Sequence, residues 1–365
     1  MADWVRLGDV CTISGINEQL NFSEEYWLLN LDMVEKQTGR ILSYQYVSAE
    51  ALEGSIIGFD TNNVLYSKLR PNLNKVVLPD CCGYATSEMV PLKPDAKVLS
   101  REYLAEYLRS DVFVKWAISK TTGAKMPRLG KKELLNKKIP LPSLSEQKKI
   151  SALLKKISDL IGWRQQQLVN LDELVKSRFI EMFGDPVLNP KGWLLKRFDS
   201  ICENLDSQRI PIASAERKVG PYPYYGASGI VDYVENYIFD EDLLLISEDG
   251  ANLVMRSTPI AFSISGKTWV NNHAHVVRFE HLSTQKYIEM CFELRDISDS
   301  ITGSAQPKFN QAKLNEILFP LPPLDLQNQF ADFVAQVDKS KLVAQRGVVG
   351  RFFHKRDSLH RIYLQ

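Results

Sequence analysis

The chain contains one segment twice: residues 122–150 reappear without a gap as residues 302–330. Each copy carries the motif Thr-Gly-x3-Pro, which begins at Thr122 and at Thr302, and a second motif, Pro-Leu-Pro-x-Leu-x-x-Gln, a short distance later. A duplicated chain presents two similar surfaces related by an approximate two-fold axis. We therefore expect this protein to bind a target that has two parts.

Composition restricts the class of protein. A length of 365 residues allows two or three domains, and contents of 44% hydrophobic and 24% charged residues are ordinary for a globular protein. The net charge of +1 gives no overall argument for nucleic acid, so such an argument must come from local patches. The five cysteines lack paired metal-ligand spacing and predict free thiols. With neither a signal peptide nor a membrane-length apolar run, we expect a cytoplasmic protein without membrane contact.

Each copy of the repeat follows a globular part of mixed α/β character. The first part is expected to contain short strands and one amphipathic helix over residues 102–119. The second is expected to have the same order, with a helix that begins near Ser283 and strands over residues 242–247, 259–264 and 274–279. The ends of the two globular parts correspond, whereas their interiors differ in length.

A long helix is predicted after each Pro-Leu-Pro motif. Ser145 is the expected N-cap of the first helix, which runs to about Met182 and is then about 55 Å long. Gly184 is the expected C-cap. A helix of that length needs a partner, and the second helix, which starts near Asp325, supplies it as one half of a coiled-coil-like pair.

The end of the chain departs from this pattern. Beyond Ala344 two glycines interrupt the apolar spacing, and each costs about 1 kcal/mol in a helix interior. Either the tail leaves the helix pair, or it differs from its ancestral sequence. The residues alone leave both interpretations open.

Taken together, these motifs resemble the specificity subunit of a type I restriction–modification system. The resemblance is carried by the tandem motifs and their helices, and by the junction Glu-Met-Phe-Gly-Asp-Pro at residues 181–186, followed by Asn-Pro-Lys-Gly-Trp at residues 189–193. It implies two target-recognition domains with pseudo-two-fold symmetry, each reading half of a bipartite double-stranded DNA sequence. The implied segments are two recognition domains at residues 1–140 and 193–320, a spacer helix with its linker at residues 141–192, and a spacer helix with a divergent tail at residues 321–365.

The resemblance also implies partners. The chain would be non-catalytic and hold no cofactor itself, while two modification subunits bind S-adenosylmethionine and methylate adenine. Restriction subunits, where they join, would add ATP- and Mg-dependent translocation and cleavage. The alternative function is a free-standing regulator that binds a bipartite DNA site without a methyltransferase.

Several basic and polar residues are candidates for DNA contact. Lys125, Arg128, Lys131 and the repeat equivalent Lys308 suit phosphate contacts, which dominate affinity without specifying sequence. Lys68 and Arg70 are candidates for base reading, because arginine can bind guanine through two hydrogen bonds. The second copy reads Ser-Glu-Asp-Gly-Ala-Asn at residues 247–252, so equivalent loops would read different half-sites. The alternative readers in that copy are Arg256, Lys267, Asn271, Asn272 and His273.

No pattern in the chain favours catalysis. Neither a Gly-x-Gly-x-x-Gly motif nor a phosphate-binding loop occurs. His273 and His275 have strand spacing, which would put both on one face, and with no third ligand evident they are expected to be surface histidines rather than a metal site.

Overall fold

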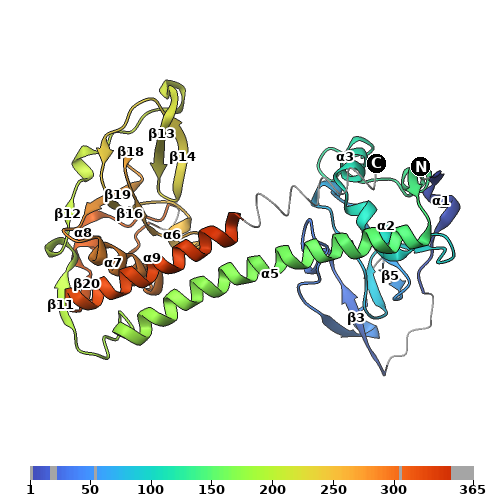
Figure 1. Ribbon diagram of the computed structural model, residues 1–365, viewed down its shortest axis with the longest axis horizontal. Helices are drawn as coiled ribbons and strands as arrows, with labels where there is room; N and C mark the ends of the chain where they lie inside the picture. Colours follow the sequence, from blue (N-terminus) through green and yellow to red (C-terminus); the bar gives the residue numbers. More distant parts are fainter. Residues whose placement is uncertain (1–2, 17–22, 53–55, 304–305, 347–365) are drawn as a thin grey trace. The chain divides into compact units, whose positions relative to one another are not determined.

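The computed structural model describes residues 3–16, 23–52, 56–303 and 306–346 (Figure 1). The chain divides into two compact units, one containing the residues up to Gln165 and the other Gln166–Ala344. The expectations for the tail from residue 347 onward lie outside the described residues. Among the described residues, no helix combines the length and the apolar character needed to cross a membrane.

The first unit is rich in β-structure. Strands β2, β9, β6 and β7 form one sheet, β4, β3, β8 and β5 form another, and β1 pairs with β10. The elements are β1 (Asp3–Arg6), α1 (Leu7–Val10), β2 (Cys11–Ile13), β3 (Glu25–Leu29), β4 (Gln45–Ser48), β5 (Ile56–Phe59), β6 (Val64–Ser67), β7 (Val76–Val77), β8 (Gly83–Thr86), β9 (Met89–Pro94), α2 (Arg101–Arg109), α3 (Asp111–Ser119), α4 (Lys131–Asn136) and β10 (Lys138–Leu141), followed by the long helix α5 (Leu144–Phe183).

The second unit repeats this plan. Its sheets have the orders β12-β19-β16-β17 and β14-β13-β18-β15, and β11 pairs with β20. The parallel pair β13–β18 corresponds to the parallel pair β3–β8. The elements are β11 (Leu194–Arg197), β12 (Glu203–Asn204), β13 (Val219–Gly226), β14 (Gly229–Val234), β15 (Phe239–Asp240), β16 (Leu243–Ser247), α6 (Asn252–Met255), β17 (Ala261–Ile264), β18 (Lys267–Val270), β19 (Ala274–Arg278), α7 (Leu282–Leu294), α8 (Gln311–Glu316), β20 (Leu318–Leu321) and α9 (Leu324–Arg346). The expected mixed α/β class and the three expected strands of this unit are confirmed.

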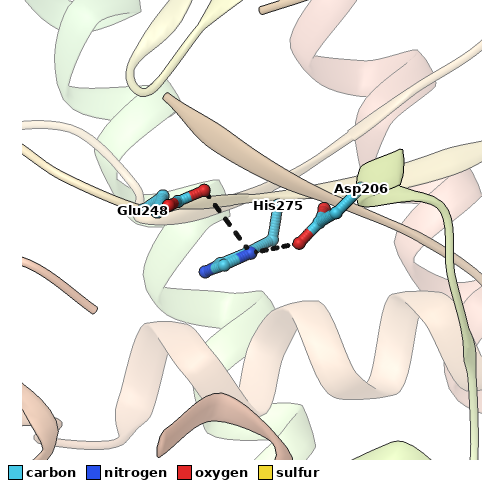
Figure 2. Close-up of side chains that lie close together, drawn as sticks. All are labelled: Asp206, Glu248 and His275. Atoms are coloured by element: carbon cyan, nitrogen blue, oxygen red, sulfur yellow. Dashed lines mark hydrogen bonds and ion pairs between the residues drawn. The ribbon is translucent and has the colours of Figure 1, made fainter. Parts of the chain in front are cut away.

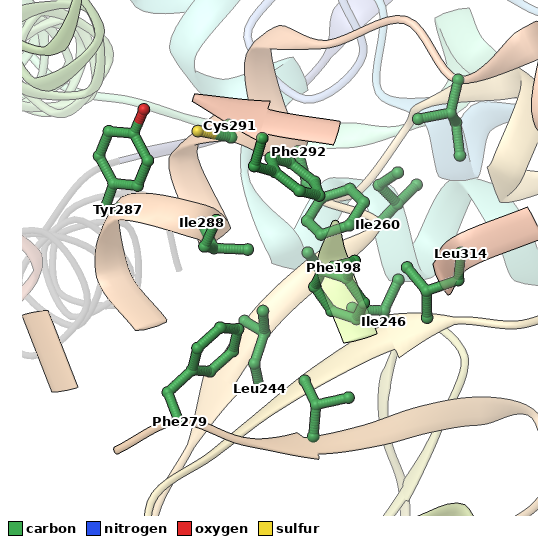
Figure 3. Packing of buried hydrophobic residues seen from close by; sticks show 14 of the residues in the cluster. Phe198, Leu244, Ile246, Ile260, Phe279, Tyr287, Ile288, Cys291, Phe292 and Leu314 are labelled. Carbon is green, nitrogen blue, oxygen red and sulfur yellow. The ribbon is translucent and has the colours of Figure 1, made fainter. Parts of the chain in front are cut away.

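Aromatic side chains fill the core of the second unit between α7 and the sheet that contains β16 (Figure 3). Phe292 of α7 lies 5.2 Å from Phe319 and 5.9 Å from Phe198, measured between ring centroids. Ile246 of β16 is fully buried in the same cluster. Because a fully buried side chain of this size contributes about 2 kcal/mol, this cluster is a main source of the unit's stability.

The two long helices pack against each other inside the second unit, as expected. Phe179 and Phe183 of α5 contact Phe330 near the start of α9, at centroid distances of 5.4 and 5.6 Å. Asp172, earlier in α5, forms an ion pair with Lys341, later in α9. Residue numbers therefore fall along one helix as they rise along the other, so the pair is antiparallel (Figure 1).

The cap of α5 differs from the expectation at one end. Ser143, not Ser145, caps the helix: its Oγ accepts from the N–H of Glu146, and its own N–H donates to the Glu146 carboxylate at 3.0 Å. This reciprocal pairing is a capping box, and it places the start of the helix two residues earlier. At the other end Gly184 has φ +79° and its N–H bonds the Ile180 carbonyl, which confirms it as the residue that ends the helix.

The expectation of a single helix over residues 102–119 is wrong, because the chain forms two helices there, α2 and α3. Ser110 between them has an extended backbone, with ψ 146°. Its side chain donates to the Tyr107 carbonyl and accepts from the Phe113 N–H, so it satisfies both broken helix ends. Serine competes with helical hydrogen bonding in this way, and the apolar periodicity on either side conceals the break.

Candidate nucleic-acid interface

The Thr-Gly-x3-Pro segments are closed by the same pair of backbone hydrogen bonds in both units. In the first, Thr122 and Arg128 exchange two backbone hydrogen bonds, at 3.0 and 2.9 Å. In the second, Thr302 and Lys308 do the same, at 2.8 and 2.7 Å. The glycine that follows each threonine has a positive φ, which a residue with a Cβ rarely adopts, so the motif needs glycine at this position.

In the first unit, a second loop is hydrogen-bonded to this segment. The N–H of Arg70 donates to the Pro127 carbonyl at 2.8 Å, and the N–H of Leu129 donates to the Lys68 carbonyl at 2.9 Å. The backbone thus places both expected base-reading residues, Lys68 and Arg70, beside Arg128.

In the second unit the same two bonds recur. The N–H of Gly250 donates to the Pro307 carbonyl at 3.1 Å, and the N–H of Phe309 donates to the Glu248 carbonyl at 2.8 Å. The loops 68–70 and 248–250 therefore occupy equivalent positions in the two units. Different half-site readings by the two units require this equivalence.

The charges on these equivalent loops are different. In the first unit Glu88 forms ion pairs with Arg128 at 3.1 Å and with Lys68 at 3.9 Å. The side chains of Arg70, Lys125 and Lys131 are exposed. Two basic groups therefore pair with one acid, and three further basic side chains are exposed on the same two segments or directly after them, which suits contact with a polyanion.

The second unit presents acids on its loop instead. The Glu248 carboxylate accepts a bond from Arg209 at 2.6 Å, and the Asp249 carboxylate lies 2.8 Å from Nδ1 of His273. Lys308, at the end of the neighbouring segment, is exposed. The same backbone thus carries a basic surface in one unit and a mixed surface in the other.

Glu248 of this loop belongs to a polar cluster with Asp206 and the buried His275 (Figure 2). Nδ1 of His275 is 2.6 Å from the Asp206 carboxylate and 3.7 Å from that of Glu248. Burial raises the pKa of Asp206. The hydrogen bonds from His275 and from the Val276 N–H lower it by more, so the pKa lies below its ordinary value. The hydrogen bonds of the cluster therefore favour the ionised form of Asp206.

The expectation that His273 and His275 share one surface face is wrong for His275. Its side chain is 1% exposed, whereas that of His273 is 50% exposed. His273 belongs to the turn before β19, so strand alternation does not extend to it.

The ligand atoms of Asp206, Glu248 and His275 lie within 4.8 Å of one another, a spacing that a metal ion could use. However, the Arg209 guanidinium lies 3.5 Å from Asp206 and 2.6 Å from Glu248, so it already supplies positive charge at this place. Nε2 of His275 also donates to the Phe309 carbonyl at 2.8 Å. The geometry is that of a hydrogen-bonded structural network.

The remaining predicted readers have intramolecular contacts. The Arg256 guanidinium donates to the carbonyls of Phe292 and Arg295 at the end of α7. Asn271 is buried and accepts from the His273 N–H at 2.8 Å. Lys267 lies over the Tyr237 ring, 4.7 Å from its centroid, and its side chain is exposed. Of these three, Lys267 has the side chain most accessible to a ligand.

Sequence reasoning missed Glu88, Asp206 and Arg209. Glu88 pairs with Arg128, Arg209 with Glu248, and Asp206 with His275, and the two partners of each pair are at least 39 positions apart in the sequence. Local patterns carry no signal for such pairs. The repeat carried a partial signal, because it made the two loops comparable position by position.

Comparison with known proteins agrees with this architecture. A putative type I restriction enzyme specificity subunit of Haemophilus influenzae is 33% identical over 134 residues, which are 37% of this chain and 34% of that protein. The alignment thus spans about a third of that relative's length. The type I restriction enzyme MjaVIII specificity subunit of Methanocaldococcus jannaschii is 27% identical over 290 residues, covering 70% of this chain and 68% of the relative.

A solved structure with the same fold is the S subunit of a type I restriction-modification system from M. genitalium, with a TM-score of 0.61 and 14% identity over 100% of this chain and 96% of that one. Another comes from work on complex assembly and conformational transition of the type I R-M system, with a TM-score of 0.57 and 16% identity over 99% and 95% of the two chains. The family model described as "Type I restriction modification DNA specificity domain" matches residues 1–172 and 190–346. Since this match covers most of the sequence, the chain belongs to the type I restriction-modification DNA specificity family.

Proposed function

We propose that this chain reads a bipartite double-stranded DNA target, with one recognition domain for each half-site. We assign the two recognition domains to residues 1–140 and 193–320, a spacer helix with its linker to residues 141–192, and a spacer helix with a divergent tail to residues 321–365. One observation carries the proposal: equivalent loops, 68–70 and 248–250, have the same backbone bonds but opposite charge. A shared scaffold with a varied surface is what two different half-sites require.

The two loops and their neighbouring segments are the proposed DNA-contacting surface. Arg128, Lys125, Lys131 and Lys308 contact phosphates, which sets affinity and salt dependence. Lys68 and Arg70 contact base edges in the first half-site, where arginine favours guanine. In the second domain Lys267 contributes from β18, while Arg256 and Asn271 act through the structural bonds described above.

The partners follow from the family. The chain docks two modification subunits, which bind S-adenosylmethionine and methylate adenine, and the chain itself holds no cofactor. Where restriction subunits join the same complex, they bring ATP and Mg. The apolar residues left exposed on α5, such as Trp163 at 69% and Val169 at 54%, support a role for this helix in subunit contact.

The test is co-expression with the methyltransferase encoded beside the gene. The mass of the purified complex is measured, and methylated sites in host DNA are mapped by single-molecule sequencing. One copy of this chain with two methyltransferases, and a split motif that disappears when the chain is deleted, would support the proposal. A chain that stays alone and leaves methylation unchanged, yet binds a bipartite DNA site, would favour the free-standing regulator instead.

Within that experiment, Arg70→Ala is the informative variant. We expect it to relax base preference in one half-site only, by about tenfold, since one good base contact contributes roughly that much discrimination. Lys36→Ala is the matched control, because it also removes one positive charge from an exposed side chain of the first unit, outside the proposed surface. It should leave both half-sites unchanged.

A further inference from the structure

The two domains differ at one buried position next to the reading loop. In the first, β6 pairs with β9 so that Ser67 faces Met89 and Tyr66 faces Val90. In the second, β16 pairs with β19 so that Ser247 faces Ala274 and Ile246 faces His275. His275 therefore stands where the first domain has a fully buried valine, Val90. At this register position an ionisable ring stands where the first domain has an apolar side chain.

His275 connects three separate segments of the second domain. Its Nδ1 contacts the Asp206 carboxylate at 2.6 Å, and its Nε2 donates to the Phe309 carbonyl at 2.8 Å. Phe309 directly follows Lys308, and its own N–H bonds the Glu248 carbonyl. The ring thus ties the start of the domain to the Thr-Gly-x3-Pro segment and, through that segment, to the loop 248–250.

The network joins polar and charged groups of one domain. Both ring nitrogens of His275 lie within hydrogen-bond distance of an oxygen, one on the Asp206 carboxylate and one on the Phe309 carbonyl. The Arg209 guanidinium lies between the carboxylates of Asp206 and Glu248, at 3.5 and 2.6 Å. Both acids of the loop are thus held by groups of their own domain, Glu248 by Arg209 and Asp249 by the half-exposed His273.

We propose that His275 is a positioning residue for base reading: through Asp206, Arg209 and Glu248 it fixes the loop 248–250 and so determines which bases the second domain accepts. The inference rests on the proposed function, because it assigns a role within the same DNA-reading surface. His275 and Asp206 have side chains only 1% and 9% exposed, so neither touches DNA. Any effect of these residues on base preference must pass through the loop.

Two variants test this role in the complex with the methyltransferase. His275→Val installs the residue of the first domain, and Asp206→Asn removes one charge from the network while keeping the side chain's size. The matched control is Val90→Ala, which disturbs the equivalent buried position of the first domain without touching a polar network. Methylated motifs and the thermal unfolding of each complex are measured together.

We expect both network variants to lose about tenfold in base discrimination at the half-site read by the second domain, which Arg70→Ala leaves unchanged. At the half-site read by the first domain they should retain full discrimination. Val90→Ala should lower thermal stability while both half-sites keep their consensus. If His275→Val does not assemble, the isosteric Asp206→Asn decides the question.

Unchanged base preference in assembled variants would overturn the inference, and so would an equal loss at both half-sites, which indicates general unfolding. Failure of the proposed function looks different, because then the wild-type complex itself would methylate no split motif.

Discussion

Arg128 donates from its Nε to both carboxylate oxygens of Glu88, at 3.1 and 3.2 Å. Lys68 lies 3.9 Å from the same carboxylate, so one acid serves two of the residues that we assign to DNA contact. The Arg128 side chain is 42% exposed, and a pair with that much solvent contributes at most about 1 kcal/mol to stability. The larger effect of Glu88 is therefore on the charge that the first domain offers to DNA.

Replacing Glu88 with Gln should strengthen DNA binding and weaken its selectivity. The variant leaves Arg128 and Lys68 without their carboxylate, which adds about one net positive charge to the surface. We expect tighter binding to non-specific duplex and a slope of log affinity against log salt that is steeper by about one. Fluorescence anisotropy of labelled duplexes over a salt series measures both quantities.

Glu181→Gln is the control for this prediction, because it removes the same charge from an exposed helical ion pair with Arg178, away from the loop. An identical salt slope in Glu88→Gln and wild type would show that these basic groups do not contact phosphates.

The start of α5 gives a stability prediction. Ser143→Ala removes the capping side chain and should lower the free energy of unfolding by about 1 kcal/mol. Ser145→Ala should change it by less than about 0.5 kcal/mol, since Ser145 is exposed and lies inside the helix. Equilibrium urea unfolding of the full chain compares the two. A larger loss of unfolding free energy for Ser145→Ala than for Ser143→Ala would show that Ser145 is the N-cap, as the sequence alone predicted.

The last glutamine of the Pro-Leu-Pro motif is buried in both repeats but bonded differently. Gln147 donates to the carbonyls of Val98 and Pro142 and accepts from the Ser100 N–H, each at 2.8 Å. Gln327 donates to the Pro322 carbonyl, and among the described residues its Oε1 has no hydrogen-bond partner.

These differences predict unequal costs for the same substitution. Gln147→Leu leaves several buried backbone groups unpaired and should lower the free energy of unfolding by about 3 kcal/mol, against about 1 kcal/mol for Gln327→Leu. Urea unfolding of both variants under one set of conditions measures the difference. Equal losses would mean that the bonds of Gln147 to residues 98 and 100 contribute nothing.

The repeat explains why much of this fold could be predicted. Proline motifs, long apolar periodicity and Gly184 are local signals, and they located both long helices to within two residues. The Ser110 break was missed because serine is compatible with helix, and only its bonds to residues 107 and 113 reveal the interruption. Local propensity does not contain that information.

The candidate site was predictable only in part, for a related reason. Basic residues near the Thr-Gly-x3-Pro motif are visible in the sequence, whereas the equivalence of the loops is shown by their matching backbone hydrogen bonds in the structure. Whether a basic side chain is available to DNA depends on partners that the fold brings from elsewhere. Arg256 illustrates the point, because its guanidinium binds carbonyls of residues 292 and 295.

The cysteines give a prediction that is independent of DNA binding. Burial raises the pKa of the Cys11, Cys202 and Cys291 thiols to about 12, whereas Cys82 is exposed. Because the thiolate is the reactive form, a thiol with that pKa is only about one part in ten thousand ionised near pH 8. Iodoacetamide at that pH should therefore label Cys82 well before these three, and their labelling should rise as the pH approaches 12.

Mass spectrometry of timed digests follows each site, and labelling in urea, where all five cysteines become accessible, is the control. Equal rates for Cys82 and Cys291 in the native chain would show that the core around α7 opens readily.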